Sequence, residues 1–555
     1  MQRDMASSEA DYIIVGGGLT GCVVASCLKE ADPNLDVLII EAGADESNNE
    51  ATKAFPTLFS LLDSDLDWSY KTTPQKNTAD RVHPIHAGKA LGGGSVTNFQ
   101  GWSRGDARDY GQWARIVKDE RWSYDGLLPY FRKSETFFDR DADAGQHGFE
   151  GPIHVTAVSE GPSGRKYPLR EPIKEAWLQV GEAFNPDGCS GDLAGVCEFY
   201  ESWHNGQRQP ANVAYGLEGV RRITEALVHR VEFTETHGER IASGVVLADG
   251  RRFTARKEVI LAAGALRTPQ VLLLSGIGPA ETLAKFDIPT VIDVPEVGRN
   301  LTDHFALYQI YKLRNPERGL ALGSPVLSDP VFLQGFPCDW AVNQVVPREI
   351  LEPALRRDEQ YGHTTGDESL LIPGRPLVET LAVYASGGVP GVPTDGSVIM
   401  TSVMLLGATS RGLISISSAD PTDPPLIDAN YFDTEVDKVT LIHGARRTMQ
   451  ALLDTSAAKD YIEAEIPPPG MAALSARSTD AEFEARIRTT GLAHHHSSGT
   501  AAMGTVVDTD LRVKGVRNLR VVDASVLPIS IGGHPQATLY AVAEQAAEII
   551  LQGTN

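Results

Sequence analysis

A glycine-rich turn between an apolar strand and a helix constrains the fold of this chain more than any other stretch. Residues 12–15 are apolar and predict a buried strand, and residues 19–28 predict the helix that follows the turn. The turn has the G-x-G-x-x-G spacing, formed by Gly16, Gly18 and Gly21. Leu19 and Thr20 begin the predicted helix, where free N–H groups and the helix dipole favour a phosphate. The pattern predicts a parallel sheet that binds a dinucleotide.

A second apolar strand ends in an acidic residue at the position that nucleotide binding requires. Residues 37–40 predict this strand, and Glu41 and Ala42 follow it. A carboxylate about twenty residues after the last glycine accepts hydrogen bonds from a ribose. A glycine fingerprint alone is a weak signal, because glycine-rich turns are common. The strand, the helix, the second strand and Glu41 in this order make the prediction specific.

Length and charge limit the classes of protein to which this sequence can belong. A chain of 555 residues exceeds what one hydrophobic core supports, so two lobes are expected. The net charge of -23 argues against nucleic acid and an anionic membrane surface as partners. There is no run of about 18 apolar residues, so no membrane span is predicted. The first residues contain no apolar signal core, which predicts an intracellular, cytoplasmic protein and leaves secretion open if a leader was removed.

A second glycine-rich segment covers residues 86–98. Four of the seven residues from 88 to 94 are glycines, which suits a loop that brings backbone donors against a flat ligand. A plain surface turn is the alternative interpretation. The apolar residues Leu91, Val96 and Phe99 argue against full exposure and therefore favour the ligand.

The combination of these segments resembles the glucose-methanol-choline (GMC) flavin oxidoreductases. In that family a GK-x-LGG-x-S-x-x-N segment, here residues 88–98, wraps the isoalloxazine ring of FAD. The resemblance continues through residues 130–135, 147–152 and 258–269 and covers nearly the whole chain. It implies further FAD contacts at Gly92, Ser95, Asn98, Phe99, Gln100, Trp102, Val228, Asp523, Ala524, Pro535 and Gln536.

The same resemblance implies an α/β fold whose two lobes alternate along the chain. The expected Rossmann-like FAD-binding lobe comprises residues 1–155, 206–304 and 491–555. The expected substrate lobe, an antiparallel sheet flanked by helices, comprises residues 156–205 and 305–490. Residues 410–418 alternate apolar and polar side chains, as an antiparallel strand does. Residues 305–400 contain no recognisable chemical motif, although in the family this region builds the substrate pocket.

The sequence of residues 206–304, between the two parts of the substrate lobe, predicts further strands and a helix. Residues 226–233 predict an edge strand and residues 259–262 a buried one. Thr268 is expected to cap the next helix, with Pro269 in its first turn.

Histidines near the C-terminus are the candidate catalytic residues. A metal site at His494, His495 and His496 is not predicted, since no carboxylate or cysteine lies at ligand spacing and adjacent side chains of a strand diverge. The family's active-site histidine lies in H-x-x-G-T-x-x-M-G, and only His496 occupies that position. The second active-site residue of the family, His or Asn, corresponds to His534. His494 and His495 are expected to be structural or to touch substrate.

The resemblance implies oxidation of an alcohol CH–OH group by hydride transfer to the N5 atom of the flavin. The hydroxyl proton must then be accepted, and a neutral imidazole with a pKa near 6.5 is suited to this at physiological pH. His496 is the expected proton acceptor and His534 its hydrogen-bonding partner. Thr97 stands where some family members carry the histidine that bonds the flavin, so non-covalent FAD is expected. The expected partners are an alcohol and oxygen or another electron acceptor.

Three alternatives share part of this pattern. Hydroxynitrile lyases and a natural-product cyclase of the family keep the fold and the flavin without net redox chemistry. A photoenzyme is disfavoured, because its cysteine and arginine signature is not found. A flavin-binding protein without catalysis is disfavoured by the presence of both His496 and His534.

Overall fold

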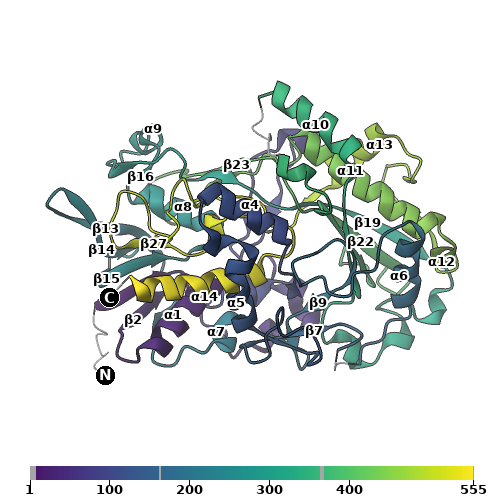
Figure 1. The fold of residues 1–555 in the computed structure, drawn as a ribbon, viewed down its shortest axis with the longest axis horizontal. Coiled ribbons are helices and arrows are strands. Elements are labelled where there is room, and N and C mark those ends of the chain that lie inside the picture. The colour runs from purple at the N-terminus through teal and green to yellow at the C-terminus, as the bar shows by residue number, and fades with distance from the viewer. Residues whose placement is uncertain (1–7, 162–163, 363–367, 390, 554–555) are drawn as a thin grey trace.

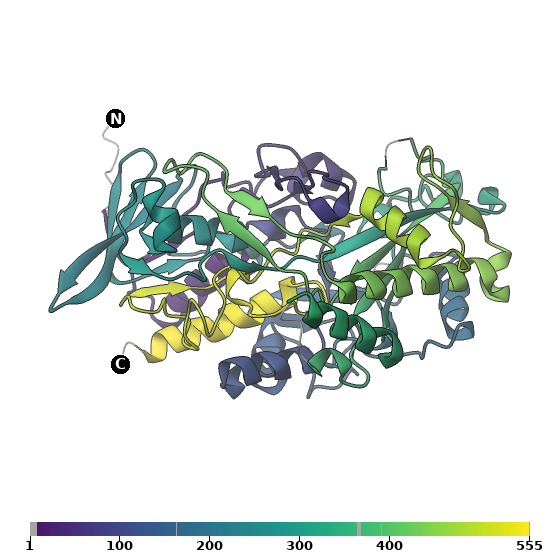
Figure 2. The same ribbon diagram turned by 90° about the horizontal axis from the view of Figure 1, so that it is seen from above.

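Two seven-stranded sheets form the framework of the protein. The computed structural model describes residues 8–161, 164–362, 368–389 and 391–553. The two sheets lie at opposite ends of an elongated molecule (Figures 1 and 2). The predicted mixed α/β class is confirmed.

The first sheet contains the predicted parallel strands. Its order is β12 (Arg221–Ile223), β2 (Val37–Ile40), β1 (Glu9–Val15), β15 (Arg252–Leu261), β14 (Glu239–Leu247) and β13 (Val228–Thr236), and β27 (Leu519–Val521) pairs with β15. β1 is parallel to both β2 and β15, and Ile14 lies opposite Ile39 and Ile260. The side chains of residues 12–15 and 37–40 are at most 3% exposed. Central parallel strands are covered on both faces, which explains these continuous apolar runs.

Helices from both ends of the chain cover the first sheet. α1 (Leu19–Ala31) begins directly after the glycine-rich turn and packs against α14 (Gln536–Gln552). α14 also packs against α5 (Tyr124–Ser134), and Figure 1 shows the three helices side by side. The first and last helices of the protein therefore share one hydrophobic layer.

The helix after β15 begins earlier than predicted. α8 spans Gly264–Leu274, so Pro269 lies inside the helix and Thr268 is not its cap. The carboxylate of Asp523 accepts hydrogen bonds from the backbone N of Gly264 and from Oγ1 of Thr268, at 2.9 and 2.5 Å. Pro269 has no N–H for the carbonyl of Ala265, which instead accepts a hydrogen bond from Oγ1 of Thr500 at 2.6 Å. Distant segments thus supply the partners that local sequence lacks.

The second sheet is antiparallel, as predicted. Its order is β25 (Ile462–Ile466), β19 (Phe305–Leu313), β22 (Val398–Leu405), β21 (Val378–Val383), β20 (Trp340–Gln344) and β8 (Gly195–Glu198), and β26 (Leu492–Ala493) pairs with β19. α11 (Glu435–Met449) packs on β21 and β22, and α6 (Arg170–Gln179) packs on β8. Strand β8 reaches this sheet from a part of the chain far from its other members. The lobe boundaries given above remain predictions.

Smaller elements connect the two sheets. The remaining α-helices in the described part of the chain are α2 (Leu58–Leu61), α3 (Gly94–Thr97), α4 (Ala107–Val117), α7 (Ala211–Ala214), α9 (Ala280–Ala284), α10 (Arg348–Gln360), α12 (Ser456–Lys459) and α13 (Asp480–Thr490). Short sheets are formed by β5 (Gly101–Trp102), β9 (Tyr200–Glu201), β7 (Ile153–Ala157) and β6 (Glu135–Phe137), and by β18 (Arg299–Leu301), β23 (Gly412–Ser415) and β24 (Leu426–Asp428). The remaining strands pair as β3 (Tyr70–Lys71) with β4 (Pro84–Ile85), β10 (Trp203–His204) with β11 (Gln207–Arg208), and β16 (Ile277–Gly278) with β17 (Ile292–Asp293).

Two further predictions concern single elements. Of the alternating residues 410–418, only residues 412–415 form a strand, β23, which is antiparallel to β18 and β24. The predicted edge strand at residues 226–233 is β13, which lies at one end of the first sheet. Across the residues described by the structure, every helix is too short or too polar to pass through a bilayer.

Candidate active site

A cavity of about 1220 Å³ runs from the glycine-rich turn to the C-terminal histidines. Val15 and Ile40 line it where β1 and β2 end, and Ile310, Leu381 and Met400 line it from strands of the second sheet. Ligands of parallel α/β sheets bind at the carboxyl ends of the strands. The cavity therefore begins where a nucleotide is expected and ends where the candidate catalytic residues lie.

Most of the predicted site residues share this cavity. Those that line it are Gly16, Gly18, Leu19, Thr20, Glu41, Ala42, Ser95, Asn98, Phe99, Gln100, Val228, His496, Asp523, Ala524, His534, Pro535 and Gln536. Gly21, Gly92 and Trp102 lie outside the lining. A Cβ atom on Gly21 would meet the carbonyl O of Gly16 at 2.2 Å, so this glycine permits close packing of α1 on the turn. Gly92 has a φ of 104°, which favours glycine.

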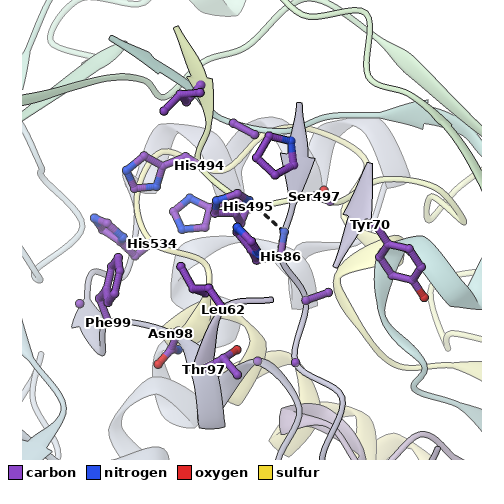
Figure 3. A pocket seen from close by; sticks show the side chains of 18 of the residues that line it. Leu62, Tyr70, His86, Thr97, Asn98, Phe99, His494, His495, Ser497 and His534 are labelled. Atoms are coloured by element: carbon purple, nitrogen blue, oxygen red, sulfur yellow. Dashed lines mark hydrogen bonds between the residues drawn. The ribbon is translucent and has the colours of Figure 1, made fainter. Parts of the chain in front are cut away.

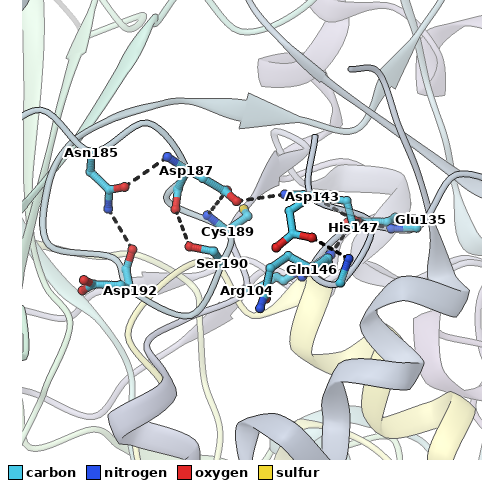
Figure 4. Close-up of polar contacts among 12 residues, drawn as sticks. Arg104, Glu135, Asp143, Gln146, His147, Asn185, Asp187, Cys189, Ser190 and Asp192 are labelled. Carbon is cyan, nitrogen blue, oxygen red and sulfur yellow. Dashed lines mark hydrogen bonds and ion pairs between the residues drawn. The ribbon is translucent and has the colours of Figure 1, made fainter. Parts of the chain in front are cut away.

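Trp102 belongs to a buried polar network rather than to the cavity wall. Its Nε1 donates a hydrogen bond to Oε2 of Glu135 at 3.1 Å. The other oxygen of Glu135 binds Arg104 and lies 2.9 Å from Nδ1 of His147, and Nε2 of His147 lies 3.1 Å from Asp187. Figure 4 shows Arg104, Glu135, His147 and Asp187 of this network close together. The family segments at residues 130–135 and 147–152 thus meet in a structural network.

Glu41 is placed to hold a ribose. Its Oε2 accepts a hydrogen bond from the backbone N of Gly17 at 2.7 Å, and its Oε1 accepts one from that of Gly43 at 2.8 Å. Burial raises the pKa of Glu41, and these two N–H groups oppose the shift because they stabilise the carboxylate. Each carboxylate oxygen accepts more than one hydrogen bond, so both retain capacity for hydroxyl groups.

The glycine segments leave room for a ligand in contact with the backbone. A Cβ atom added to Gly94 would meet no atom within 4 Å, and one added to Gly18 would meet its first neighbour at 3.8 Å. Both glycines line the cavity. The open space at these positions, together with Glu41, fits a bound dinucleotide such as FAD.

Two of the predicted flavin contacts, Asn98 and Gln536, lie next to each other. Nδ2 of Asn98 donates to Oε1 of Gln536 at 3.1 Å, and Nε2 of Gln536 donates to the carbonyl O of Gly101 at 2.6 Å. The carboxylate of Asp523 is engaged with Gly264, Thr268 and Ser525. A cofactor contact of Asp523 is therefore expected from its backbone.

The candidate catalytic histidines meet at the other end of the cavity. The ring centroids of His496 and His534 lie 5.2 Å apart, and those of His496 and His494 lie 4.8 Å apart. Nε2 of His534 lies 2.9 Å from Oε1 of Glu379, a buried residue of β21. Figure 3 shows His494, His495 and His534 gathered on one side of Thr97 and Asn98. His494 and His495 line the cavity as well.

The electrostatics favour neutral imidazoles at His494 and His496. Burial, and then the neighbouring histidines, hold the pKa values of His496 and His494 well below the usual 6.5. A neutral imidazole that lines the cavity is a competent proton acceptor at physiological pH.

Sequence reasoning missed two partners of these histidines. Glu379 contacts His534 across 155 residues of sequence, and His304 contacts His496 across 192 residues. Glu379 belongs to residues 305–400, where the sequence contains no recognisable chemical motif, and His304 immediately precedes this region. Spacing cannot reveal such pairs, because β19 and β21 bring them in only through the fold.

The histidine cluster also meets a geometric criterion for a metal site. The ring nitrogens of His494, His496 and His534 lie within 4.8 Å of one another. Zinc–nitrogen bonds of about 2.0–2.1 Å require ligand atoms about 3.3 Å apart in a tetrahedral site. Nδ1 of His496 is moreover already paired with His304 at 2.9 Å. The absence of a catalytic metal remains a prediction.

Aromatic side chains form the wall beside His534. The rings of Phe99 and Phe336 stack with centroids 5.8 Å apart, and Phe199 meets His534 edge-on at 6.2 Å. Phe199 also packs against Phe336 at 5.6 Å, and all three phenylalanines line the cavity. This part of the cavity suits an apolar portion of a small molecule.

The chain belongs to the GMC oxidoreductase family, because models of this family match residues 10–306 and 408–543. This is a family of flavoprotein oxidoreductases with a Rossmann-type FAD-binding fold. The GMC-type oxidoreductase acuG of Aspergillus aculeatus is 40% identical over 98% of this chain and 99% of its own length. The oxygen-dependent choline dehydrogenase of Pseudomonas syringae pv. syringae is 33% identical over 98% and 94%. A formate oxidase variant from Aspergillus oryzae, studied for FAD modification, has a similar fold with a TM-score of 0.86, 29% identity and 99% of both chains covered.

Proposed function

We propose that this protein is an FAD-dependent oxidoreductase that oxidises the CH–OH group of a small alcohol. The observation that carries the proposal is the pair His496 and His534, which face one cavity with the nucleotide-binding residues. FAD, when bound, supplies the hydride acceptor. The protein supplies position and proton transfer.

His496 takes the hydroxyl proton of the substrate in this proposal. Its low pKa leaves it neutral, with a ring nitrogen available as an acceptor. His534 orients the hydroxyl, and Glu379 holds the His534 ring from the far side at 2.9 Å. Removal of the hydroxyl proton avoids a protonated carbonyl product as the hydride leaves.

An anaerobic screen of alcohol classes tests the proposal. The purified holoenzyme is mixed with each alcohol in the absence of oxygen, and bleaching of the flavin absorbance is followed. We expect at least one class to bleach the flavin, and admission of air then distinguishes an oxidase from a dehydrogenase. Formation of a product while the flavin stays oxidised would support the non-redox members of the family instead.

The flavin should be released by acid. Thr97 has no nucleophilic ring nitrogen for the histidyl bond that some family members form, so we expect the FAD to be held by non-covalent contacts. Precipitation of the yellow protein with acid should leave the pigment in the supernatant, where chromatography identifies it as FAD. Pigment that remains in the pellet would contradict this expectation.

The rate of flavin reduction should change little between about pH 6 and 8. The pKa of His496 is lowered, so its neutral form persists as pH falls and is lost only below that lowered pKa. An imidazole of ordinary pKa would lose about three quarters of its neutral form at pH 6. Stopped-flow reduction at a series of pH values, with flavin content measured at each, distinguishes the two cases. A rate that falls with a midpoint near 6.5 would show that His496 is not the acceptor or is more exposed in the holoenzyme.

A further inference from the structure

His304 contacts the proposed base from behind the cavity wall. Its Nδ1 lies 2.9 Å from Nδ1 of His496, and its Nε2 lies 3.0 Å from Oγ of Ser530. The side chains of His304 and Ser530 are buried. Among the described residues that line the cavity, His496 is present and these two are not. Any influence of His304 or Ser530 on substrate is therefore exerted through neighbouring residues, of which His496 is the one that His304 contacts directly.

The hydroxyl of Ser530 fixes the direction of these hydrogen bonds. Its Oγ donates to the backbone carbonyl of Leu406 at 2.8 Å. A carbonyl only accepts and a hydroxyl has one proton, so toward His304 the Ser530 oxygen can only accept. Nε2 of His304 consequently carries a proton. In a neutral imidazole the other nitrogen is then an acceptor, so Nδ1 of His304 receives a hydrogen bond from Nδ1–H of His496.

His304 is suited to remain neutral throughout the reaction. Burial, with a contribution from His534, lowers the pKa of His304 to about 3. A proton delivered to Nε2 of His496 arrives on the side of that ring away from His304, which contacts Nδ1. His304 keeps its role as an acceptor before and after that transfer.

We propose that the chain of Leu406, Ser530 and His304 fixes His496 in the Nδ1–H tautomer and leaves Nε2 as the proton-accepting atom. His304 and Ser530 are positioning residues in this scheme, which rests on the proposed function. When Nε2 of His496 takes the hydroxyl proton of the alcohol, the imidazolium keeps its Nδ1–H bond to His304. Each donor and each acceptor in the series Leu406, Ser530, His304 and His496 keeps its role during the proton transfer.

The backbone of His496 is held by Asp303, the residue that immediately precedes His304. Its backbone N donates to Oδ1 of Asp303 at 2.6 Å. The hydroxyl of Tyr431 donates to Oδ2 of Asp303, also at 2.6 Å, and fixes the carboxylate. Consecutive residues Asp303 and His304 thus hold the main chain and the ring of His496. A proton acceptor needs both, because its ring must keep one orientation toward the substrate.

The direct test is the protonation pattern of the His496 ring in the holoenzyme. Nitrogen-15 NMR of histidine-labelled protein distinguishes protonated from unprotonated ring nitrogens, and loss of a signal in His496→Gln assigns it. We expect Nδ1 protonated and Nε2 unprotonated in the natural protein. In Ser530→Ala the Nε2–H of His304 loses the Ser530 oxygen and is left with the backbone carbonyls of Ile531 and Leu406 near its ring. The His496 signals should then shift toward a mixture of tautomers.

Kinetics provide the second readout. Ser530→Ala should lower the limiting rate of anaerobic flavin reduction about tenfold, because part of the population holds the wrong tautomer. The substrate concentration at half-saturation should change by less than about twofold, since Ser530 does not line the cavity. Ser134→Ala is the matched control, because the buried Ser134 also donates to a carbonyl, that of Phe131, away from the cavity. It should reduce flavin at the natural rate.

Two results would overturn the inference. One is a His496 ring protonated on Nε2 in the natural protein. The other is a Ser530→Ala variant that matches the natural protein in both NMR pattern and reduction rate. If His496→Ala reduces flavin normally while the NMR shows the expected tautomer, the proposed function fails and the inference about His304 stands.

Discussion

Replacement of His496 by alanine should slow anaerobic flavin reduction by an alcohol about a hundred- to ten-thousand-fold, the usual contribution of a positioned base. The variant keeps the hydride acceptor but has no group at this place to take the hydroxyl proton. Flavin content should stay near that of the natural protein, because Glu41 and the glycine segments lie at the other end of the cavity. Stopped-flow absorbance at saturating alcohol gives the limiting rate.

The control for this prediction is His443→Ala. His443 is a partly buried histidine of α11 and lies outside the cavity lining. Its removal should leave the reduction rate unchanged, which separates loss of the base from loss of any imidazole. A His496→Ala variant that reduces flavin as fast as His443→Ala would remove His496 from the mechanism and favour the non-redox alternative.

The second histidine should matter less. His534→Asn keeps a hydrogen-bonding side chain beside Glu379, and the family accepts Asn at this position, so its reduction rate should fall much less than that of His496→Ala. His534→Ala leaves the buried carboxylate of Glu379 without this partner and should lie between the two, with weaker substrate binding. Equal losses in His534→Asn and His496→Ala would mean that the roles are shared or reversed.

Glu41→Arg should yield protein without flavin. The ribose loses its carboxylate acceptor, and a larger cation enters the part of the cavity that the ribose would occupy. The backbone N–H groups of Gly17 and Gly43 also lose their acceptors, which disturbs the turn expected to hold the phosphates. The ratio of flavin to protein absorbance measures the outcome directly.

Glu50→Arg is the matched charge reversal. The side chain of Glu50 is 79% exposed and pairs with Lys53 at the surface, so the substitution should cost little. Its flavin content should equal that of the natural protein. Full flavin occupancy in Glu41→Arg would remove Glu41 from the cofactor site and require another residue to hold the ribose.

Local sequence predicts the nucleotide-binding part of the fold because its determinants are local. Residues 12–15 and 37–40 are short, uniformly apolar and flanked by glycine or Glu41, and the structure places them in β1 and β2. The glycine spacing likewise depends on contacts within one turn. Such features are visible without knowledge of the fold.

Features that depend on distant partners escape the same reasoning. The start of α8 was misplaced because Asp523, 255 residues from Thr268, supplies the hydrogen bonds at its N-terminus. Trp102 follows a glycine-rich segment that lines the cavity, yet its indole turns to Glu135. Glu379 reaches His534 from β21, and His304 reaches His496 from the position directly before β19. Their roles follow from packing and not from motif.

The contact between α1 and α14 determines when this protein can finish folding during its synthesis. β1 emerges from the ribosome first, but β27 and α14 are among the last segments made. At a synthesis rate of roughly 5–20 residues per second, roughly 25 to 100 seconds pass between the synthesis of β1 and that of β27 and α14. His496 and His534 are translated in that same final interval. A chain whose synthesis stops before β27 and α14 therefore has neither a complete first sheet nor the histidine pair. Its uncovered apolar surface is then open to chaperones.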